Sequence, residues 1–126
     1  MRLLLDTVTF IWATTSPELL SKMALAALQD ENAIREMSAI SLSELAIKQA
    51  KGKFSFGRED ALASIADLRV RILPYTAEHA YELFNLPYHH GDPFDRQIIA
   101  QALAEKIPVV TSDEKFGLYK NLKVIW

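Results

Sequence analysis

The stretch His89-His90-Gly91-Asp92-Pro93-Phe94-Asp95-Arg96 opens the segment that decides the fold, and this segment continues to Asp113. A polar loop with two carboxylates leads into an apolar helical pattern, then into the β-branched pair Val109-Val110, and then to a third carboxylate. The apolar positions that recur at the spacing of one helix face are Phe94, Ile98, Ile99, Ala102 and Leu103. This order predicts a helix that packs on a sheet and holds Asp95 in its first turn.

Two explanations fit the acids at the start of this helix. Pro93 fixes its own φ and disfavours helical geometry at Asp92, so the helix is expected to begin between Asp92 and Asp95. An aspartate there can cap the free backbone N–H groups of the first turn. Alternatively, these acids converge with Asp113 on a divalent cation, because hard oxygen ligands suit Mg²⁺ and Mn²⁺. This stretch alone leaves both explanations open.

Length and composition favour one globular domain over residues 1–126. Half of the 126 residues are hydrophobic, which is enough for a buried core but leaves no room for a second domain. The absence of cysteine excludes disulfides and thiolate metal sites. No apolar run reaches the length of a signal or membrane-spanning segment, so we expect a soluble, cytoplasmic protein with no membrane partner.

Charge gives no direct sign of a nucleic-acid partner. The formal net charge is −2, from 14 basic and 16 acidic residues, so any attraction for such a partner must be local. Lys48, Lys51, Lys53 and Arg58 lie close together in the sequence, and a solvated surface is their simpler explanation.

Five short apolar runs predict strands. They comprise residues 2–5, 37–40, 70–73, 109–110 and 122–126. Helical patterns separate these runs, so we expect a three-layer α/β/α fold around a central, mostly parallel sheet of about five strands. The first strand would deliver Asp6 to the carboxyl edge of the sheet, where ligands bind in open α/β folds.

Capping signals predict where the helices of the first half begin. Thr7 is expected to cap a turn over 8–13, and Ser16-Pro17 to open a helix over 19–29. The buried stripe predicted for this second helix is Leu20, Met23, Ala24, Ala27 and Leu28. Ser41 and Glu44 have the spacing of a capping box, in which case Glu44 would need no metal.

Further signals delimit the remaining helices. Gly52 is the expected stop of the helix that contains Glu44. A helical run over 59–68 follows, and Thr76 is expected to cap the next helix.

Four carboxylates are expected at one edge of the sheet. Asp6 and Asp113 each follow an apolar strand, while Asp95 and Glu44 lie in helices that begin at the same edge. Without a cation these groups would repel one another and their pKa values would rise, whereas a bound divalent metal removes the conflict.

With these motifs in place, the sequence resembles the PIN-domain ribonucleases, and more closely the toxin subunits of VapBC-type toxin–antitoxin pairs. The stretches that carry the resemblance span nearly the whole chain and are Leu3-Leu4-Leu5-Asp6-Thr7, Ser41 to Lys48, Asp92-Pro93-Phe94-Asp95-Arg96 and Val110-Thr111-Ser112-Asp113. The Asp-Pro-Phe-Asp-Arg segment is the most specific of them. The chain departs from the family at Val8, where histidine is frequent, and at Ser43, where an aromatic residue is frequent.

The resemblance implies an Mg²⁺- or Mn²⁺-dependent endoribonuclease that forms a homodimer. Such a protein would be the toxin of a type II toxin–antitoxin system and would be neutralised by its cognate antitoxin. The implied catalytic metal ligands are Asp6, Glu44, Asp95 and Asp113.

Four further side chains have secondary roles in this interpretation. Asp92 is either an additional acid of the site or a helix cap. Thr111 would orient a ligand or water, as would Ser112, although a capping role suits Ser112 better. Arg96 would meet a phosphate, the antitoxin or a carboxylate of the site.

Histidines and large aromatic residues receive simpler explanations. Two adjacent histidines have poor geometry for one ion, so we expect His89 and His90 to be loop or substrate-edge residues and not ligands. His79 is expected on the surface or packed in its helix. Trp12 and Tyr88 are candidates for stacking on bases, with core or dimer packing the better explanation for Trp12.

Two other functional classes remain open at this stage. An Mg-dependent phosphatase-like domain also places an aspartate after its first strand, but Val8 stands where an Asp-x-Asp loop has its second acid. A non-catalytic protein-binding module would use the same acids only as helix caps. Loss of Mg²⁺ or Mn²⁺ binding in Asp6→Asn and Asp95→Asn would argue against that module.

Overall fold

The computed structural model describes residues 1–126 and contains one five-stranded sheet. The strands are β1 (Arg2–Leu5), β2 (Ile34–Ser38), β3 (Arg71–Leu73), β4 (Val109–Val110) and β5 (Val124–Ile125). Their order is β3-β2-β1-β4-β5, and every neighbouring pair is parallel. The predicted parallel sheet is confirmed, although β2 begins three residues earlier in the chain than expected.

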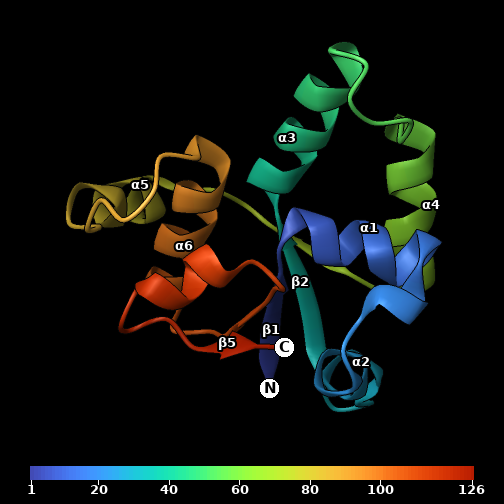
Figure 1. The fold of residues 1–126 in the computed structure, drawn as a ribbon, viewed down its shortest axis with the longest axis horizontal. Helices are drawn as coiled ribbons and strands as arrows, with labels where there is room; N and C mark the ends of the chain where they lie inside the picture. Colours follow the sequence, from blue (N-terminus) through green and yellow to red (C-terminus); the bar gives the residue numbers. More distant parts are fainter.

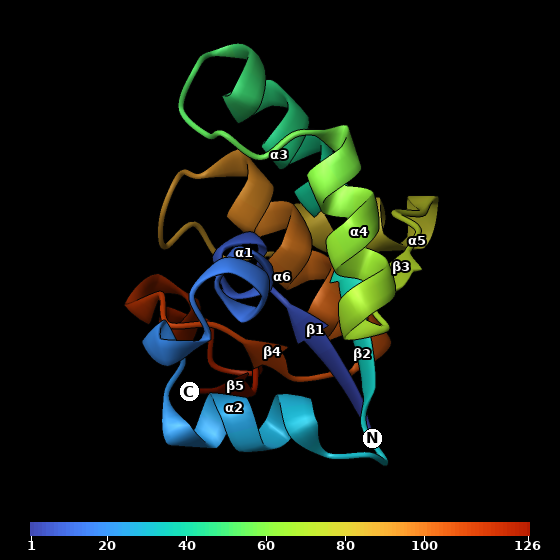
Figure 2. The ribbon, with the colours of Figure 1, turned by 90° about the vertical axis from the view of Figure 1, so that its right-hand side faces the viewer.

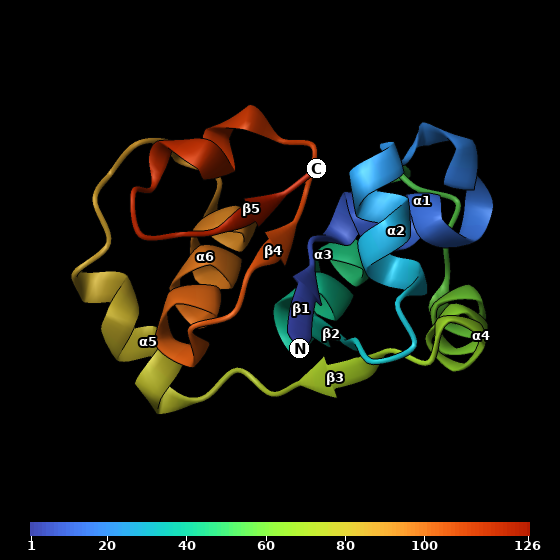
Figure 3. The same cartoon turned by 90° about the horizontal axis from the view of Figure 1, so that it is seen from below.

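Helices cover both faces of the sheet. They are α1 (Thr7–Thr15), η1 (Pro17–Leu19), α2 (Lys22–Gln29), α3 (Ala39–Ala50), α4 (Arg58–Leu68), α5 (Ala77–Phe84), α6 (Pro93–Glu105) and η2 (Glu114–Leu118), where η marks a 3₁₀-helix. In Figure 1 the helices α1, α2 and α4 lie on one side of β1 and β2, with α5 and α6 on the other. The view from below shows the same two layers (Figure 3), which confirms the α/β/α architecture.

Neighbouring residues of β1 face two different hydrophobic cores. Leu3 and Leu5 belong to the core under α1, α2 and α4, whereas Leu4 belongs to the core under α5 and α6. Because both faces of this central strand are covered, its sequence is a continuous apolar run. Ile98 and Ile99 of α6 are fully buried beside Leu4, as the helical spacing predicted.

Two helix caps differ from the prediction. Asp6, not Thr7, caps α1 by accepting a 2.9 Å hydrogen bond from the Thr9 N–H. The helix α3 begins at Ala39 with Ser38 as its cap, so Glu44 lies in the second turn and the predicted capping box is wrong. The physical reason is that β2 runs directly into α3 without a loop, which moves the cap toward the strand end.

The helix predicted over 19–29 is divided in two. After η1 the backbone is extended at Leu20, and α2 starts beyond Ser21, which accepts a 3.0 Å hydrogen bond from the Ala24 N–H. This start places Ala24 and Leu28 on the inner face, four residues apart, and both are buried. Met23 is 63% exposed, so its place in the predicted stripe is wrong. Figure 2 shows α2 lying across the end of the molecule that carries the N-terminus.

The remaining helix signals agree with the structure. The positive φ of 73° at Gly52 lies just beyond the end of α3, α4 spans nearly the predicted range, and Thr76 caps α5. None of the helices combines the length and the apolar character that a membrane-spanning segment needs.

The sheet has a topological switch point beside β1. The strand β2 pairs with one side of β1 and β4 with the other, so the connections leave the sheet in opposite directions. In open α/β sheets such a point leaves a crevice at the carboxyl ends of the strands, where ligands bind. Asp6 directly follows β1 and Asp113 lies three residues beyond β4, at this crevice.

Candidate active site

One cavity of about 190 Å³ lies at the carboxyl edge of the sheet. Its lining residues are Asp6, Thr7, Val8, Glu44, Lys48, Asp92, Asp95, Ser112 and Asp113. The structure therefore brings the four predicted carboxylates together, with Asp92 as a fifth acid and Lys48 as the only cation of the lining. They come from four separate segments of the chain.

Asp6 is held at the base of this cavity by buried donors. Its Oδ1 accepts from the Thr9 N–H at 2.9 Å, and its Oδ2 accepts from the Thr111 hydroxyl at 2.6 Å. Burial raises the pKa of the Asp6 carboxyl, against the opposing effect of these hydrogen bonds. Thr111 thus orients the carboxylate of Asp6, and its predicted role in orienting a ligand or water stays a prediction.

Glu44 is buried and both of its oxygens have partners. Oε1 accepts from the Thr7 hydroxyl at 2.5 Å, and Oε2 pairs with the Lys48 ammonium at 2.5 Å. The bond to Glu44 raises the pKa of Lys48, and the charges of Asp92 and Asp95 act in the same direction. The positive charge of Lys48 therefore compensates a carboxylate that the cavity would otherwise leave unpaired.

Asp95 is a second acid of the site whose pKa is raised. Burial, followed by the charges of Asp92, Asp113, Glu44 and Asp6, raises the pKa of its carboxyl from 3.8 to about 7. Asp92 caps α6 by accepting a 2.9 Å hydrogen bond from the Asp95 N–H, so the predicted capping role of Asp92 is confirmed. Asp92 lines the cavity as well, and a contribution to metal binding stays a prediction.

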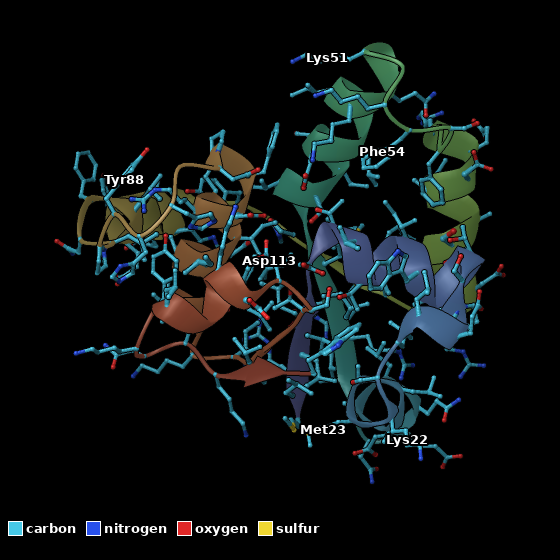
Figure 4. All side chains as sticks on the ribbon, viewed as in Figure 1. Lys22, Met23, Lys51, Phe54, Tyr88 and Asp113 are labelled. Atoms are coloured by element: carbon cyan, nitrogen blue, oxygen red, sulfur yellow. The ribbon has the colours of Figure 1, made fainter.

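Asp113 closes the opposite side of the cavity. Its N–H donates to the Thr111 hydroxyl at 3.0 Å, and its Oδ1 accepts from the Lys115 N–H at 2.9 Å. Asp113 therefore caps η2, and the cap predicted at Ser112 is wrong by one residue. Figure 4 shows Asp113 near the centre of the molecule, between α6 and the start of α1.

Arg96 does not pair with a carboxylate of the site. Its guanidinium donates to the carbonyl oxygens of Pro87 at 2.8 Å and Leu86 at 3.3 Å, and to the Tyr119 hydroxyl at 3.2 Å. It also lies over the ring of Tyr88, 4.7 Å from its centroid. The alternative of a carboxylate pair is therefore wrong, because α6 directs Arg96 toward the loop before it.

His90 is a site residue that sequence reasoning missed. Its Nδ1 lies 2.8 Å from the Tyr119 hydroxyl, and its Nε2 lies 3.3 Å from Asp95 Oδ2. Burial lowers the pKa of His90, which favours the neutral imidazole. The only feature of the sequence that could have indicated this contact with the site is the position of His90 two residues before Asp92. Its other partner, Tyr119, is 29 residues away in the chain.

The other histidines and aromatic residues mostly follow the expectations. His89 is exposed, and His79 is packed in the interior, where its Nε2 lies 2.8 Å from Glu105. Trp12 packs against Trp126 with ring centroids 6.0 Å apart, which agrees with a packing role. Tyr88 lies far from the cavity centre at the outer edge of the loop (Figure 4).

The donor set suits a hard divalent cation. The lining offers carboxylate and hydroxyl oxygens and no histidine or cysteine, and the Lys48 ammonium already neutralises one acid. The carboxylate oxygens of Asp6 and Glu44 accept hydrogen bonds from protein donors. No three acidic or histidine side chains are arranged to hold a metal ion in their present conformations. Ligation requires side-chain rotation, and the metal site stays a prediction.

Comparison with protein families identifies the fold. The model described as "PIN domain" matches residues 3–122. The chain belongs to the PIN-domain family. A sequence search of curated proteins gives no significant match.

Solved structures with a similar fold include components of toxin–antitoxin complexes. This PIN domain resembles a chain of VapBC2 from Rickettsia felis, crystallised with a promoter DNA fragment, with TM-score 0.76, 22% identity and coverage of 98% and 97% of the two chains. A second similar structure is VapBC-5 from Mycobacterium tuberculosis, a member of the VapBC family of toxin-antitoxin systems. Its TM-score is 0.66 and its sequence identity 20%, with coverage of 98% of this chain and 96% of that chain. FitAcB from Neisseria gonorrhoeae has a TM-score of 0.61 and a sequence identity of 23%, with coverage of 97% of this chain and 95% of that chain. At these identities the likeness shows the fold.

Proposed function

We propose that this PIN domain is a metal-dependent endoribonuclease that hydrolyses RNA phosphodiester bonds. The observation that carries the proposal is the convergence of Asp6, Glu44, Asp95 and Asp113 in one cavity at the switch point of the sheet. These four side chains would hold Mg²⁺ or Mn²⁺, since clustered carboxylates are stabilised by a hard cation.

The chain's own residues would prepare the site for hydrolysis. A bound divalent cation supplies an acidified water and neutralises charge on the phosphate, so no protein nucleophile is needed. Thr111 holds Asp6 in place, and Thr7 holds Glu44. Ser112 lies at the rim and is exposed, where its hydroxyl can donate to a phosphate oxygen.

Exposed basic side chains lie on segments that carry acids of the site, and they suit an RNA strand. Lys51 and Lys53 are exposed beyond the end of α3, the helix that carries Glu44, and Lys115 follows Asp113. Figure 4 shows Lys51 at the outer tip of α3. Contacts from such lysines to phosphates are independent of base sequence and weaken with salt. A chain of net negative charge would thus approach RNA through basic side chains outside the cavity.

The biological role we infer is that of a toxin held inactive by an antitoxin. Solved structures with a similar fold include members of toxin–antitoxin systems, one of them crystallised with promoter DNA. A toxin of this kind would act on cytoplasmic RNA, and we expect it to form a homodimer. Expression without a partner should arrest growth in the wild type and not in Asp6→Asn, and a co-expressed cognate antitoxin should relieve the arrest.

RNA cleavage by the purified protein tests the enzymatic proposal. We expect total RNA to be cut in Mn²⁺ or Mg²⁺, with no cutting in EDTA, and cleavage to fall at least about 100-fold in Asp6→Asn and Asp95→Asn. Asp67→Asn serves as the matched control, because Asp67 is exposed and lies outside the cavity. Equal cleavage by the wild type and both site variants would refute the assignment.

One alternative has a specific observation in its favour. Asp6, Asp92 and Asp113 each cap a helix, which is the role a non-catalytic binding module would give them. Titration with Mn²⁺ separates the two possibilities. The nuclease binds Mn²⁺ in the wild type and loses this binding in Asp6→Asn, whereas a module that uses its acids only as caps binds none.

A further inference from the structure

A partly buried row of hydrogen bonds leads from Arg96 to Asp95. Arg96 Nη1 donates to the Tyr119 hydroxyl at 3.2 Å, Tyr119 Oη lies 2.8 Å from His90 Nδ1, and His90 Nε2 lies 3.3 Å from Asp95 Oδ2. Tyr119 is 2% exposed, and the side chain of His90 is 7% exposed. Only Asp95, of these four residues, lines the acidic cavity.

Arg96 sets the direction of the first bond in this row, and the hydroxyl proton of Tyr119 sets the direction of the next. A guanidinium donates and never accepts, so the Tyr119 oxygen accepts from Arg96. The single hydroxyl proton of Tyr119 has no other acceptor among the hydrogen bonds of the structure, so it is assigned to His90 Nδ1, the unprotonated nitrogen of a neutral imidazole. Nε2 then carries the ring proton and donates to Oδ2 of Asp95.

The row is anchored at its far end. Arg96 is held by the carbonyl oxygens of Pro87 and Leu86 as well as by Tyr119, and its side chain lies over Tyr88. These contacts leave the guanidinium little freedom to turn away. The orientation of the buried imidazole is therefore set by residues on both sides of it.

We propose that His90 is a positioning residue for Asp95, fixed in the Nε2–H tautomer by Tyr119 and Arg96. By binding Oδ2, His90 sets the carboxylate plane and leaves Oδ1, which has no side-chain partner, free for a cation. Groups that orient a ligand without touching the metal commonly change metal affinity 10- to 100-fold when they are removed. The proposal rests on the proposed metal-dependent function of the cavity.

Nitrogen NMR tests the tautomer without any metal or substrate. In ¹⁵N-labelled wild-type protein in EDTA, two-bond proton–nitrogen correlations should show a protonated Nε2 and an unprotonated Nδ1 for His90. Tyr119→Phe removes the proton donor to Nδ1, and we expect the Nδ1–H form to become populated. An Nδ1–H tautomer or an imidazolium in the wild type at pH 7.5 would overturn the proposal.

Mn²⁺ affinity, measured by electron paramagnetic resonance, tests the consequence for the metal. We expect His90→Leu to weaken binding by about 10- to 100-fold and Tyr119→Phe by about 10-fold, although neither residue lines the cavity. His90→Gln should restore most of the affinity, because its amide nitrogen can take the place of Nε2 as the donor. In RNA cleavage the losses should be recovered in part at high Mn²⁺, which a general folding defect would not allow.

Two control variants separate positioning from packing. His89→Leu removes a ring that packs 4.8 Å from that of Tyr119 but makes no bond in the row, and Tyr81→Phe removes the hydroxyl of an exposed tyrosine. Both should bind Mn²⁺ like the wild type. Wild-type affinity in Tyr119→Phe and His90→Leu overturns the positioning role and leaves the proposed function standing. Failure of the wild type to bind Mn²⁺ overturns both, while the NMR result still reports on the row itself.

Discussion

Replacing Asp95 by asparagine should stabilise the metal-free protein while it removes the activity. The carboxylate of Asp95 is partly buried among acids, which raises its pKa from 3.8 to about 7. Between about pH 4 and pH 7 the folded protein holds a proton at this group that the unfolded chain has released. The stability of the metal-free protein therefore falls as the pH rises through this window.

The size of the effect follows from the pKa. A tenfold difference in proton affinity corresponds to about 1.4 kcal/mol, so a rise from 3.8 to about 7 costs about 4 kcal/mol above pH 7. Solvent screening in the open cavity reduces this cost to about 2 kcal/mol. Asparagine carries no charge and avoids the cost, and its amide oxygen can still accept from His90.

Denaturation in EDTA at pH 5 and pH 8 measures this difference. We expect the Asp95→Asn variant to be the more stable protein at pH 8 and its advantage to grow by about 1 to 2 kcal/mol between the two pH values. This corresponds to a rise in Tm of roughly 3 to 8 °C. Saturating Mn²⁺ should stabilise the wild type alone, since only a protein that binds the ligand is stabilised by it.

The control for this experiment is Asp67→Asn, which changes the same functional group at an exposed position. Its stability relative to the wild type should be the same at both pH values. We would abandon this explanation if Asp95→Asn were less stable than the wild type at pH 8, or if its stability relative to the wild type did not change with pH. Either result would show that the neighbouring carboxylates do not destabilise the charged form of Asp95.

Three further perturbations test other contacts of the site and fold. Thr111→Val removes the 2.6 Å bond to buried Asp6 and should cost about 1 to 3 kcal/mol in urea denaturation at pH 7, with a matching loss of Mn²⁺ affinity. Lys48→Met removes the ammonium that lies 2.5 Å from Glu44, so the Tm in EDTA should fall. The Mn²⁺ affinity measured by calorimetry should rise, because the ion no longer competes with the ammonium for Glu44. Gly52→Ala places a Cβ at a φ of 73° with open space around it, and thermal denaturation should show a loss of about 1 kcal/mol from backbone strain alone.

The sequence predicted much of the fold because its signals are local. Apolar runs, a proline at the start of α6 and a glycine after α3 act within a few residues of themselves. Where a strand continues directly into a helix, the same signals fail, as at Ser38 and Ser41. Ser41 and Glu44 do have the spacing of a capping box, but β2 places the cap at Ser38, three residues before Ser41. Glu44 is thereby left to face the cavity.

The site was predictable in its acids and not in their partners. Asp6 and Asp113 were identified because parallel strands share a carboxyl edge. The bond between Thr111 and Asp6 spans 105 residues, and no local spacing announces it. A pair with a site carboxylate was one of the alternatives for Arg96, yet its helix position turns it toward the loop at Leu86.

By itself, the sequence determined which groups are available: a parallel α/β scaffold, four acids at the ends of its elements and no cysteine. Only the tertiary structure decided how these acids are held, through Lys48 on Glu44 and His90 on Asp95. The reason is that hydrogen bonds need atoms within about 3 Å, and distances of that kind between remote segments depend on strand register and helix packing. Composition and periodicity carry no information at that scale.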